Sequence, residues 1–443
     1  MITTYLKSFE ACEQNGFSKD PAWLKLLRKQ AIDSFEKLGF PTMRDESWKY
    51  TNVTPMSRIP FQLVSEFSSL NQSQIEPFLF GNPNWQRLVF INGFYSKDLS
   101  RINQTAGLTL IPMSEALVKH SDRLKQHLSQ YADVKNSAFT ALNTAFFHDG
   151  GYFHLAKKTI ITEPVLLLFV STSSGSKQPL SQIRNLIVLD EGSKAVVIEK
   201  HASLKESDEY WSNSVTEIVL NDHSELSYHK LGQESAKGFH IGTTQVDQHD
   251  NSKLVSSSVA IDGGLVRNNL NVILNGEHTE CELNGFYLAN GTEHIDNQTL
   301  IDHPKPHGKS HQVYKGILAG KSTGVFSGKV FVHEDSQKTD ASQVNKNLLL
   351  SKEATINTKP QLEILADDVK CTHGAAVGQL DDEAIFYLKT RGIDEQAASK
   401  LLSSGFASEV INTIPIAPVR EELNRIVREK LETFWPVTAG VKS

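Results

Sequence analysis

Hydrophobic residues recur at helical spacing near the amino terminus. Between Pro21 and Leu38 apolar side chains return every three or four residues, which predicts one amphipathic helix. The strand-like segment LVFINGFY follows at 88–95, and helical spacing resumes over 114–148. We therefore expect residues 1–150 to form a mainly helical amino-terminal region.

From residue 152 the pattern changes to short β-branched runs separated by Gly, Asp, Asn and Ser, which is typical of strands. In a loose repeat, each apolar strand meets a polar corner that carries a small hydroxyl residue. These hydroxyl residues are Ser193, Ser224, Ser252, Thr279, Ser310 and Ser336. Their spacings are 31, 28, 27, 31 and 26 residues, a drifting period. We expect the polar residues of these corners to be solvated.

A period of this size predicts a solenoid, because strands this short bury a face only when coils stack on one another. We therefore predict a mainly β protein with a parallel β-helix core over residues 151–375. An antiparallel sandwich is the alternative, since short strands with regular turns also fit that fold.

Helical patterning returns after the last strand-like run. Asp381 or Asp382 is a suitable cap for a first helix, and a second helix is expected from Asp394 to Gly405. A third helix is expected after the prolines that follow the second, because its apolar residues fall on one face. These residues are Leu423, Ile426, Val427 and Leu431. Residues 376–443 are thus predicted to form a small helical domain that either caps the solenoid or docks a partner.

Composition narrows the function classes. The 443 residues are 39% hydrophobic and 22% charged, with a net charge of −6 and no run of basic residues, which argues against nucleic-acid binding. The amino terminus lacks the apolar core of a signal peptide, and the longest apolar run, 164–170, is too short to span a bilayer. We expect a cytoplasmic protein with no membrane segment.

Three cysteines, Cys12, Cys281 and Cys371, are too few and too dispersed for a disulfide framework or a CxxC metal site. Four thiolates are the usual complement for an iron–sulfur cluster, so this chain alone lacks a standard all-cysteine site. Any cluster would need ligands from a partner.

Two motifs suggest ligand sites but fail on spacing. GILAGKS at 316–322 has three residues between its glycines where a phosphate loop needs four, and a strand-like run follows it. His303, His307 and His311 would share a helix face, but Pro304 and Pro306 disfavour a helix, so a solvated corner is the expected structure. No HExxH motif occurs, and we expect no catalytic residues.

Cys371 and His373 alternate in a run that stops at Gly374, so an extended strand would point both side chains to one face. A thiol beside an imidazole is a candidate for metal chemistry. The pattern alone favours a buried thiol and a hydrogen-bonded core histidine, because lone cysteines are among the most buried residues. The functional alternative stays open at this point.

The run YKGILAGKSTGVFSGKVFVHEDSQKTDASQVNKNLLLS and the later TKPQLEILADDVKCTHGAAVGQLDDEAIFYLKTRGI closely resemble the core of the SufB/SufD family of iron–sulfur cluster assembly scaffolds. RDESWKYT at 44–51 is similar to the amino-terminal signature of the SufD branch. Asn345 stands where the SufB branch has a cluster-associated cysteine. The resemblance implies a right-handed parallel β-helix between helical terminal domains.

The resemblance also implies partners. SufD pairs with SufB through their β-helices, and its carboxy-terminal helices dock the ATPase SufC. The docking region here would include Phe386, Tyr387, Leu401, Leu402 and Phe406. A transient cluster would form at the interface with His373 as a metal ligand and Cys371 beside it, since imidazole replaces thiolate in mixed clusters. A flavin reductant would act in the complex.

Several alternatives stay open. The chain could be a purely structural partner of SufB with no ligand role, or, less in keeping with its sequence, a β-helix enzyme that acts on polysaccharide. In isolation it could form a homodimer instead of the complex with SufB.

Overall fold

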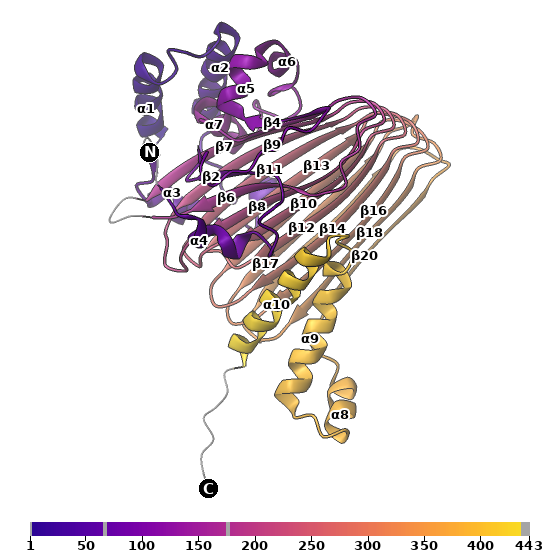
Figure 1. Ribbon diagram of the computed structural model, residues 1–443. Coiled ribbons are helices and arrows are strands. Elements are labelled where there is room, and N and C mark those ends of the chain that lie inside the picture. The colour runs from indigo at the N-terminus through magenta and orange to yellow at the C-terminus, as the bar shows by residue number, and fades with distance from the viewer. Residues whose placement is uncertain (1, 65–68, 174–177, 436–443) are drawn as a thin grey trace.

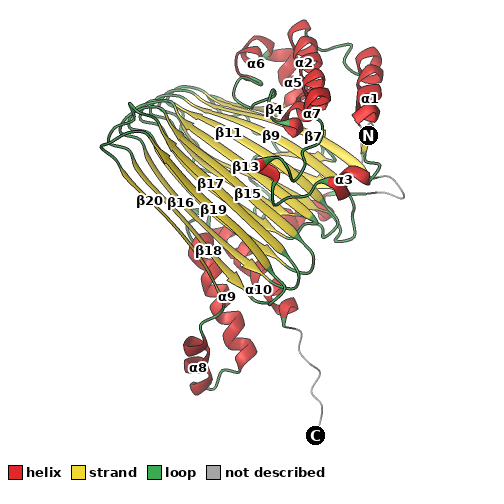
Figure 2. Cartoon of the chain, turned by 180° about the vertical axis from the view of Figure 1, so that it is seen from behind, coloured by secondary structure: helices red, strands yellow, loops and turns green. Residues whose placement is uncertain are grey.

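The computed structural model describes residues 2–64, 69–173 and 178–435. Within this part of the chain, the core is a solenoid of two facing sheets, each with ten strands. Successive long strands alternate between the sheets, so each coil contributes one strand to each layer, as Figures 1 and 2 show. The prediction of a mainly β, parallel β-helix fold is confirmed, and the antiparallel sandwich is wrong.

Each sheet is described by its strands in the order in which they occur along the chain. The first sheet contains β1 (Gln62–Leu63), β4 (Leu108–Pro112), β5 (Gly151–Leu155), β7 (Pro179–Leu189), β9 (Trp211–Leu220), β11 (Phe239–Gln248), β13 (Leu265–Leu274), β15 (His294–His303), β17 (Thr323–Val332) and β19 (Thr355–Ile364). The second contains β2 (Arg87–Ile91), β3 (Phe94–Tyr95), β6 (Val165–Ser171), β8 (Lys194–Ser203), β10 (Glu225–Gln233), β12 (Lys253–Ile261), β14 (Glu280–Ala289), β16 (Lys309–Leu318), β18 (Asp340–Leu349) and β20 (Lys370–Gly378).

Parallel pairing between successive coils holds the solenoid together. Glu225 in β10 aligns with Lys194 in β8 and with Lys253 in β12, one coil away on each side. Because the strands stay in register, every inward side chain stacks on an inward side chain of the next coil. Such apolar ladders form one continuous buried core. One of them runs through Ala195, Leu226, Leu254 and Cys281.

The corner hydroxyls form a ladder, but it lies inside the solenoid. Ser193, Ser224, Ser252 and Thr279 each accept, through the backbone carbonyl, an N–H from the next coil at 2.8–3.0 Å. Their side chains are fully buried, so the prediction of solvated corners is wrong for them. The short hydroxyls turn back onto the chain: the Ser193 hydroxyl donates to the carbonyl three residues earlier at 2.6 Å.

The last two residues of the predicted repeat, Ser310 and Ser336, are also buried, but they do not continue this ladder. In the following coils the equivalent carbonyls belong to Gly308 and Thr339, to which the N–H groups of Asp340 and Lys370 bond. Ser310 lies two residues past this ladder and Ser336 three residues before it. The apparent period drifts because loops of different length join the strands, whereas the register between the strands does not change.

The amino-terminal helices pack against the first coils (Figure 1). They are α1 (Ile2–Asn15), α2 (Ala22–Leu38), η1 (Glu46–Trp48), α3 (Thr54–Arg58), α4 (Gln72–Ile75), η2 (Glu76–Phe78), α5 (Met113–Lys119), α6 (Ser121–His127) and α7 (Ala138–Phe146). The helix expected between residues 21 and 38 is present as α2. The region also supplies β1 to β4, which extend both sheets of the solenoid.

The carboxy-terminal helices are α8 (Asp382–Thr390), α9 (Glu395–Ile411) and α10 (Ala417–Phe434). Asp381 caps α8 by accepting the N–H of Glu383. The second helix does not end at Gly405 as expected: it continues for six residues, because burial of Ala407, Val410 and Ile411 outweighs the roughly 1 kcal/mol that one glycine costs a helix. Among the described residues, no helix combines the length and apolarity needed to cross a bilayer.

The segment 44–51 anchors the amino-terminal region on the first sheet. The Arg267 guanidinium lies 3.7 Å from the centre of the Trp48 ring and donates to the Asp296 carboxylate at 2.6 Å. The Thr51 hydroxyl donates to the same carboxylate. Arg267 and Asp296 are both buried, so this ion pair is shielded from water.

Replacing Asp296 by Ala leaves the Arg267 guanidinium buried without its carboxylate. We expect the free energy of unfolding to fall by about 3–5 kcal/mol, measured by urea denaturation. The Lys329–Glu363 ion pair, at 2.6 Å between half-exposed side chains, is the control. Lys329→Ala should cost no more than about 1 kcal/mol. Equal losses for the two variants would contradict an anchoring role for the buried pair.

Candidate functional site

The solenoid ends at β19 and β20 without a cap. Each of these strands pairs on one side only, with β17 and β18 respectively, and no described residue pairs with their outer edges. The carboxy-terminal helices do not close this end, because α9 packs on β14 and β16 along the side of the second sheet. The last coil therefore presents backbone hydrogen-bonding groups and its inward side chains.

Cys371 and His373 lie on one face of β20, as their alternation predicts. They align with Ala341 and Gln343 of β18, which point into the solenoid and are buried. His373 is nevertheless exposed and Cys371 only half-buried. The prediction of a buried thiol and a buried core histidine is thus wrong, because no coil formed by the described residues covers them.

The two side chains differ in how they could bind a metal. Cys371 packs against the apolar core, and burial raises the pKa of its thiol. A raised pKa means that less of the metal-binding thiolate is present at neutral pH. The imidazole of His373 is exposed at the open end, so a metal ion can reach its ring nitrogens from solvent.

A chain of polar side chains leads inward from the open end. Gln343, the neighbour of His373, donates to Gln312 at 2.7 Å, and Gln312 donates to Thr299 at 2.8 Å. Asn345 is fully buried and donates to the carbonyl of Tyr314 at 3.1 Å. Position 345 thus holds a hydrogen-bonded interior amide.

The carboxy-terminal helices carry a group of exposed apolar side chains. Phe386 and Tyr387 on α8 are 68% and 58% exposed, and Leu401 on α9 is 54% exposed. Leu402 is half-buried, and the half-buried Phe406 ring lies 4.4 Å from the Lys315 ammonium. Of the five residues expected at a docking surface, three are thus freely exposed and two are half-buried, and Phe406 also packs against the sheet.

The three spaced histidines do not meet. His303 is buried at the end of β15, where its Nε2 lies 2.9 Å from the Ser310 hydroxyl. His307 occupies an exposed corner with a φ of 62°, and His311 is exposed on β16. The expected solvated corner is correct for His307 but wrong for His303, whose position in the in-register strand turns it inward.

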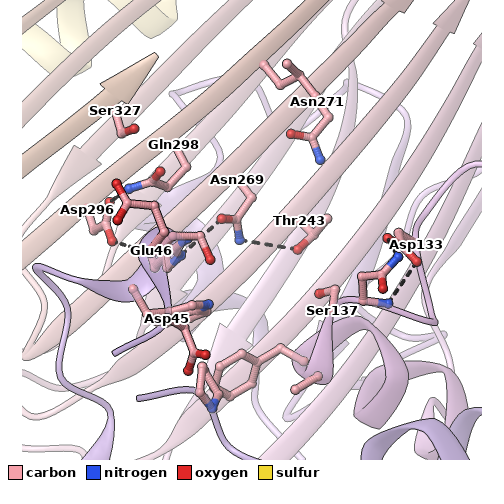
Figure 3. Close-up of a pocket in the computed structure, with 18 of the residues that line it drawn as sticks. Asp45, Glu46, Asp133, Ser137, Thr243, Asn269, Asn271, Asp296, Gln298 and Ser327 are labelled. Atoms are coloured by element: carbon pink, nitrogen blue, oxygen red, sulfur yellow. Dashed lines mark hydrogen bonds and ion pairs between the residues drawn. The ribbon is translucent and has the colours of Figure 1, made fainter. Parts of the chain in front are cut away.

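A polar groove lies between the amino-terminal segment 44–51 and the outer face of the first sheet (Figure 3). Amide and hydroxyl side chains line its floor; they include Thr243, Asn269, Asn271, Gln298 and Ser327. Two of its carboxylates are engaged: Asp296 pairs with Arg267, and Glu46 pairs with Lys359. These two carboxylates are thus held in ion pairs on the rim and floor of the groove.

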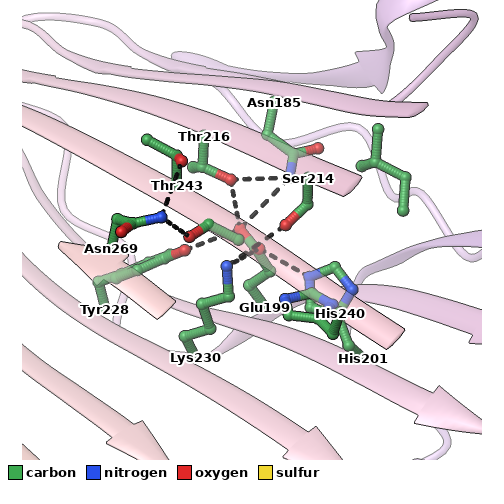
Figure 4. Close-up of polar contacts among 12 residues, drawn as sticks. Asn185, Glu199, His201, Ser214, Thr216, Tyr228, Lys230, His240, Thr243 and Asn269 are labelled. Carbon is green, nitrogen blue, oxygen red and sulfur yellow. Dashed lines mark hydrogen bonds and ion pairs between the residues drawn. The ribbon is translucent and has the colours of Figure 1, made fainter. Parts of the chain in front are cut away.

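A charged network fills the interior of the first coils and was missed in the sequence (Figure 4). Glu199 accepts from Thr216 and Tyr228 at 2.7 Å and lies 3.4 Å from the Lys230 ammonium. Burial alone would raise the pKa of the Glu199 carboxyl, but Lys230 and the hydrogen bonds outweigh it, and the pKa is lowered. The sequence does contain a hint of this network: Glu199 and Lys230 are charged residues within predicted strands, and they lie at aligned positions of adjacent coils.

Comparisons with known proteins agree on one family. The family model described as "SUF system FeS cluster assembly, SufBD core domain" matches residues 169–406, and "SufBD protein N-terminal region" matches residues 1–167. A Synechocystis relative named as an iron–sulfur cluster assembly SufBD family protein is 32% identical over 408 residues, which covers 90% of this chain and 89% of that protein. Escherichia coli "Iron-sulfur cluster assembly protein SufD" is 29% identical over 405 residues, 91% and 92% of the two chains.

The two cysteines of the solenoid should differ sharply in reactivity. In a Cys12→Ser background, we expect Cys371 to react with a water-soluble maleimide in the folded chain, while the fully buried Cys281 reacts only on unfolding. Because burial raises the pKa of the Cys371 thiol, its labelling rate should rise about tenfold per pH unit between pH 7 and 8. Mass spectrometry of peptides measures both sites. Equal labelling of Cys281 in the folded chain would contradict the structure.

Proposed function

Because the chain belongs to the SufBD family of iron–sulfur cluster assembly proteins, we propose that it is the SufD-type scaffold subunit of a cluster assembly complex. In this role it pairs with SufB, and nascent clusters are built where the two solenoids meet. SufC, docked on the carboxy-terminal helices, hydrolyses ATP and drives the rearrangement. The chain itself is not an enzyme, and the cluster is its cargo.

The uncapped end of the solenoid supports pairing with a second β-helix. Both β19 and β20 have an unpaired edge, and an apolar interior row including Ile356, Leu362 and Val377 is half-buried or exposed there. Exposed edges with apolar side chains favour strand addition by a partner, since pairing satisfies the backbone and buries that surface. A second copy of this chain offers the same edge, so a homodimer in isolation is the competing outcome.

His373 on this open end carries the proposal for cluster binding. It is an exposed imidazole on the inward row of β20, where the solenoid of a partner would face it. Imidazole is a known alternative to thiolate in iron–sulfur clusters, and the partner would supply the missing thiolates. Cys371 is the weaker candidate, because its thiol is half-buried and its pKa is raised by burial.

The exposed apolar residues of α8 and α9 support docking of the ATPase. Phe386, Tyr387 and Leu401 together present aromatic and aliphatic surface on helices that project from the solenoid (Figure 1). Aromatic side chains of this kind are typical anchors of protein interfaces. A flavin reductant and a cytoplasmic location remain predictions.

Replacing His373 by Ala should abolish or strongly reduce cluster formation on the purified complex with SufB and SufC. His311→Ala is a matched control, because His311 is an exposed histidine on the same sheet whose strand has neighbours on both sides. Cluster formation is measured by visible absorption and by iron and sulfide content after anaerobic reconstitution. Co-purification of the three proteins checks that the complex still assembles.

An intact complex with undiminished cluster formation would reject the ligand role of His373. The chain would then be a structural partner of SufB. Loss of the complex itself would instead place His373 in the pairing surface.

Introducing a negative charge into the exposed apolar surface of α8 and α9 tests whether SufC binds there. Phe386→Asp and Leu401→Asp should each weaken SufC binding at least tenfold, because a carboxylate buried in an apolar interface loses its hydration. Val118→Asp on α5 is the control, since Val118 is 82% exposed and lies in the amino-terminal region. Calorimetry with purified SufC measures the affinities. If all three variants bound SufC with the same affinity as the unaltered chain, α8 and α9 would not be part of the interface.

A further inference from the structure

Three potential metal ligands meet inside the solenoid, well away from its open end. They are His201 in β8, Glu234 just after β10, and His240 in β11. One ligand atom from each lies within 4.8 Å of the others, and all three residues are buried. Along the second sheet, β12, β14, β16 and β18 separate these coils from β20. The group is therefore independent of His373.

Two of the donor atoms face each other in the interior. His240 Nδ1 and Glu234 Oε1 are both buried and form an ion pair at 3.2 Å. Two ligands of one metal ion at bond lengths of about 2.1 Å lie about 3.0–3.4 Å apart for angles between square and tetrahedral. The observed separation fits this range.

The remaining atoms of these ligands are already oriented. The other carboxylate oxygen of Glu234 accepts a hydrogen bond from the Tyr210 hydroxyl. His201 Nε2 lies 2.8 Å from Glu199 Oε1. Metal-binding histidines commonly bond a carboxylate in this way, and ligating carboxylates are themselves hydrogen-bonded.

The charged side chains around the three ligands are mostly paired with one another, which leaves the Glu234 carboxylate available to a cation. The Lys230 ammonium lies 3.4 Å from Glu199, so these two charges offset each other. At the adjacent corner, Lys430 pairs with Asp262 at 2.6 Å. The carboxylate of Glu234 then faces two imidazoles and has no other cationic side chain within ion-pair distance among the described residues. One small cavity is lined by the three ligands together with Asp262 and with Lys230, whose charge is offset by Glu199.

We propose that His201, Glu234 and His240 bind a divalent first-row transition ion inside the solenoid. Two imidazoles and one carboxylate suit Fe²⁺, Co²⁺ or Zn²⁺ and do not suit Mg²⁺ or Ca²⁺, which prefer oxygen ligands. Water or a further group would complete the coordination. The site needs neither a partner chain nor His373, and its existence does not rest on the proposed scaffold function.

Cobalt(II) is the probe, because its visible absorption reports the ligands directly. The purified full-length chain, freed of metal and incubated with CoCl₂ long enough for a buried site to load, is expected to bind one ion in a spectroscopically distinct site. Glu234→Gln keeps the size of the side chain and should lower the affinity at least tenfold, as should His240→Ala. Tyr210→Phe should weaken binding about 10- to 100-fold without removing a ligand.

Two control variants distinguish this site from metal binding elsewhere on the chain. His303→Ala removes an equally buried interior histidine that belongs to no group of three potential metal ligands in the described part of the chain, and should leave cobalt binding unchanged. A Cys371→Ser, His373→Ala chain should also bind cobalt as the wild type does. Circular dichroism confirms that each variant is folded.

The proposal is overturned if folded Glu234→Gln and His240→Ala chains bind cobalt with wild-type affinity and spectrum. It is also overturned if the Cys371→Ser, His373→Ala chain loses the bound ion, since the open end would then be the metal site. Failure of the wild-type chain to bind any cobalt would overturn it as well. None of these outcomes depends on cluster assembly, so the scaffold function is tested separately.

Discussion

The hydrogen bonds between successive coils are the interaction on which the rest of this structure depends. They hold each strand in register with the strand one coil away, as Glu225 is held between Lys194 and Lys253. In-register stacking makes every coil repeat the inward and outward pattern of its neighbours. Apolar residues then stack on apolar residues, and a polar side chain placed inward is enclosed together with the polar side chains of adjacent coils.

This register explains why polar groups survive inside the solenoid. Glu199 aligns with Lys230 across two coils, and Gln343 aligns with Gln312, so each finds a partner at hydrogen-bonding or ion-pair distance. A buried charge without such a partner would be costly. His240 and Glu234 follow the same rule, since they pair at 3.2 Å, and His201 lies beside them.

The same interaction makes the two ends of the solenoid unequal. The amino-terminal end continues into β2 to β5 and is covered by helices that pack on the first coils. At the other end the ladder stops at β19 and β20, and α9 and α10 lie along the side of the sheet. The inward face of the final coil, including His373, is consequently a surface. The proposed pairing with a second solenoid would use this open edge.

Local patterns in the sequence determined the solenoid, the main helices, and the shared face of Cys371 and His373, because strand alternation and helical periodicity are short-range properties. Tertiary structure decided exposure: the same alternating row is buried at Gln343 and open at His373, depending only on whether another coil follows. It also decided which distant residues meet. His201 in β8 and His240 in β11 belong to the two facing sheets, so they meet only across the interior of the folded solenoid.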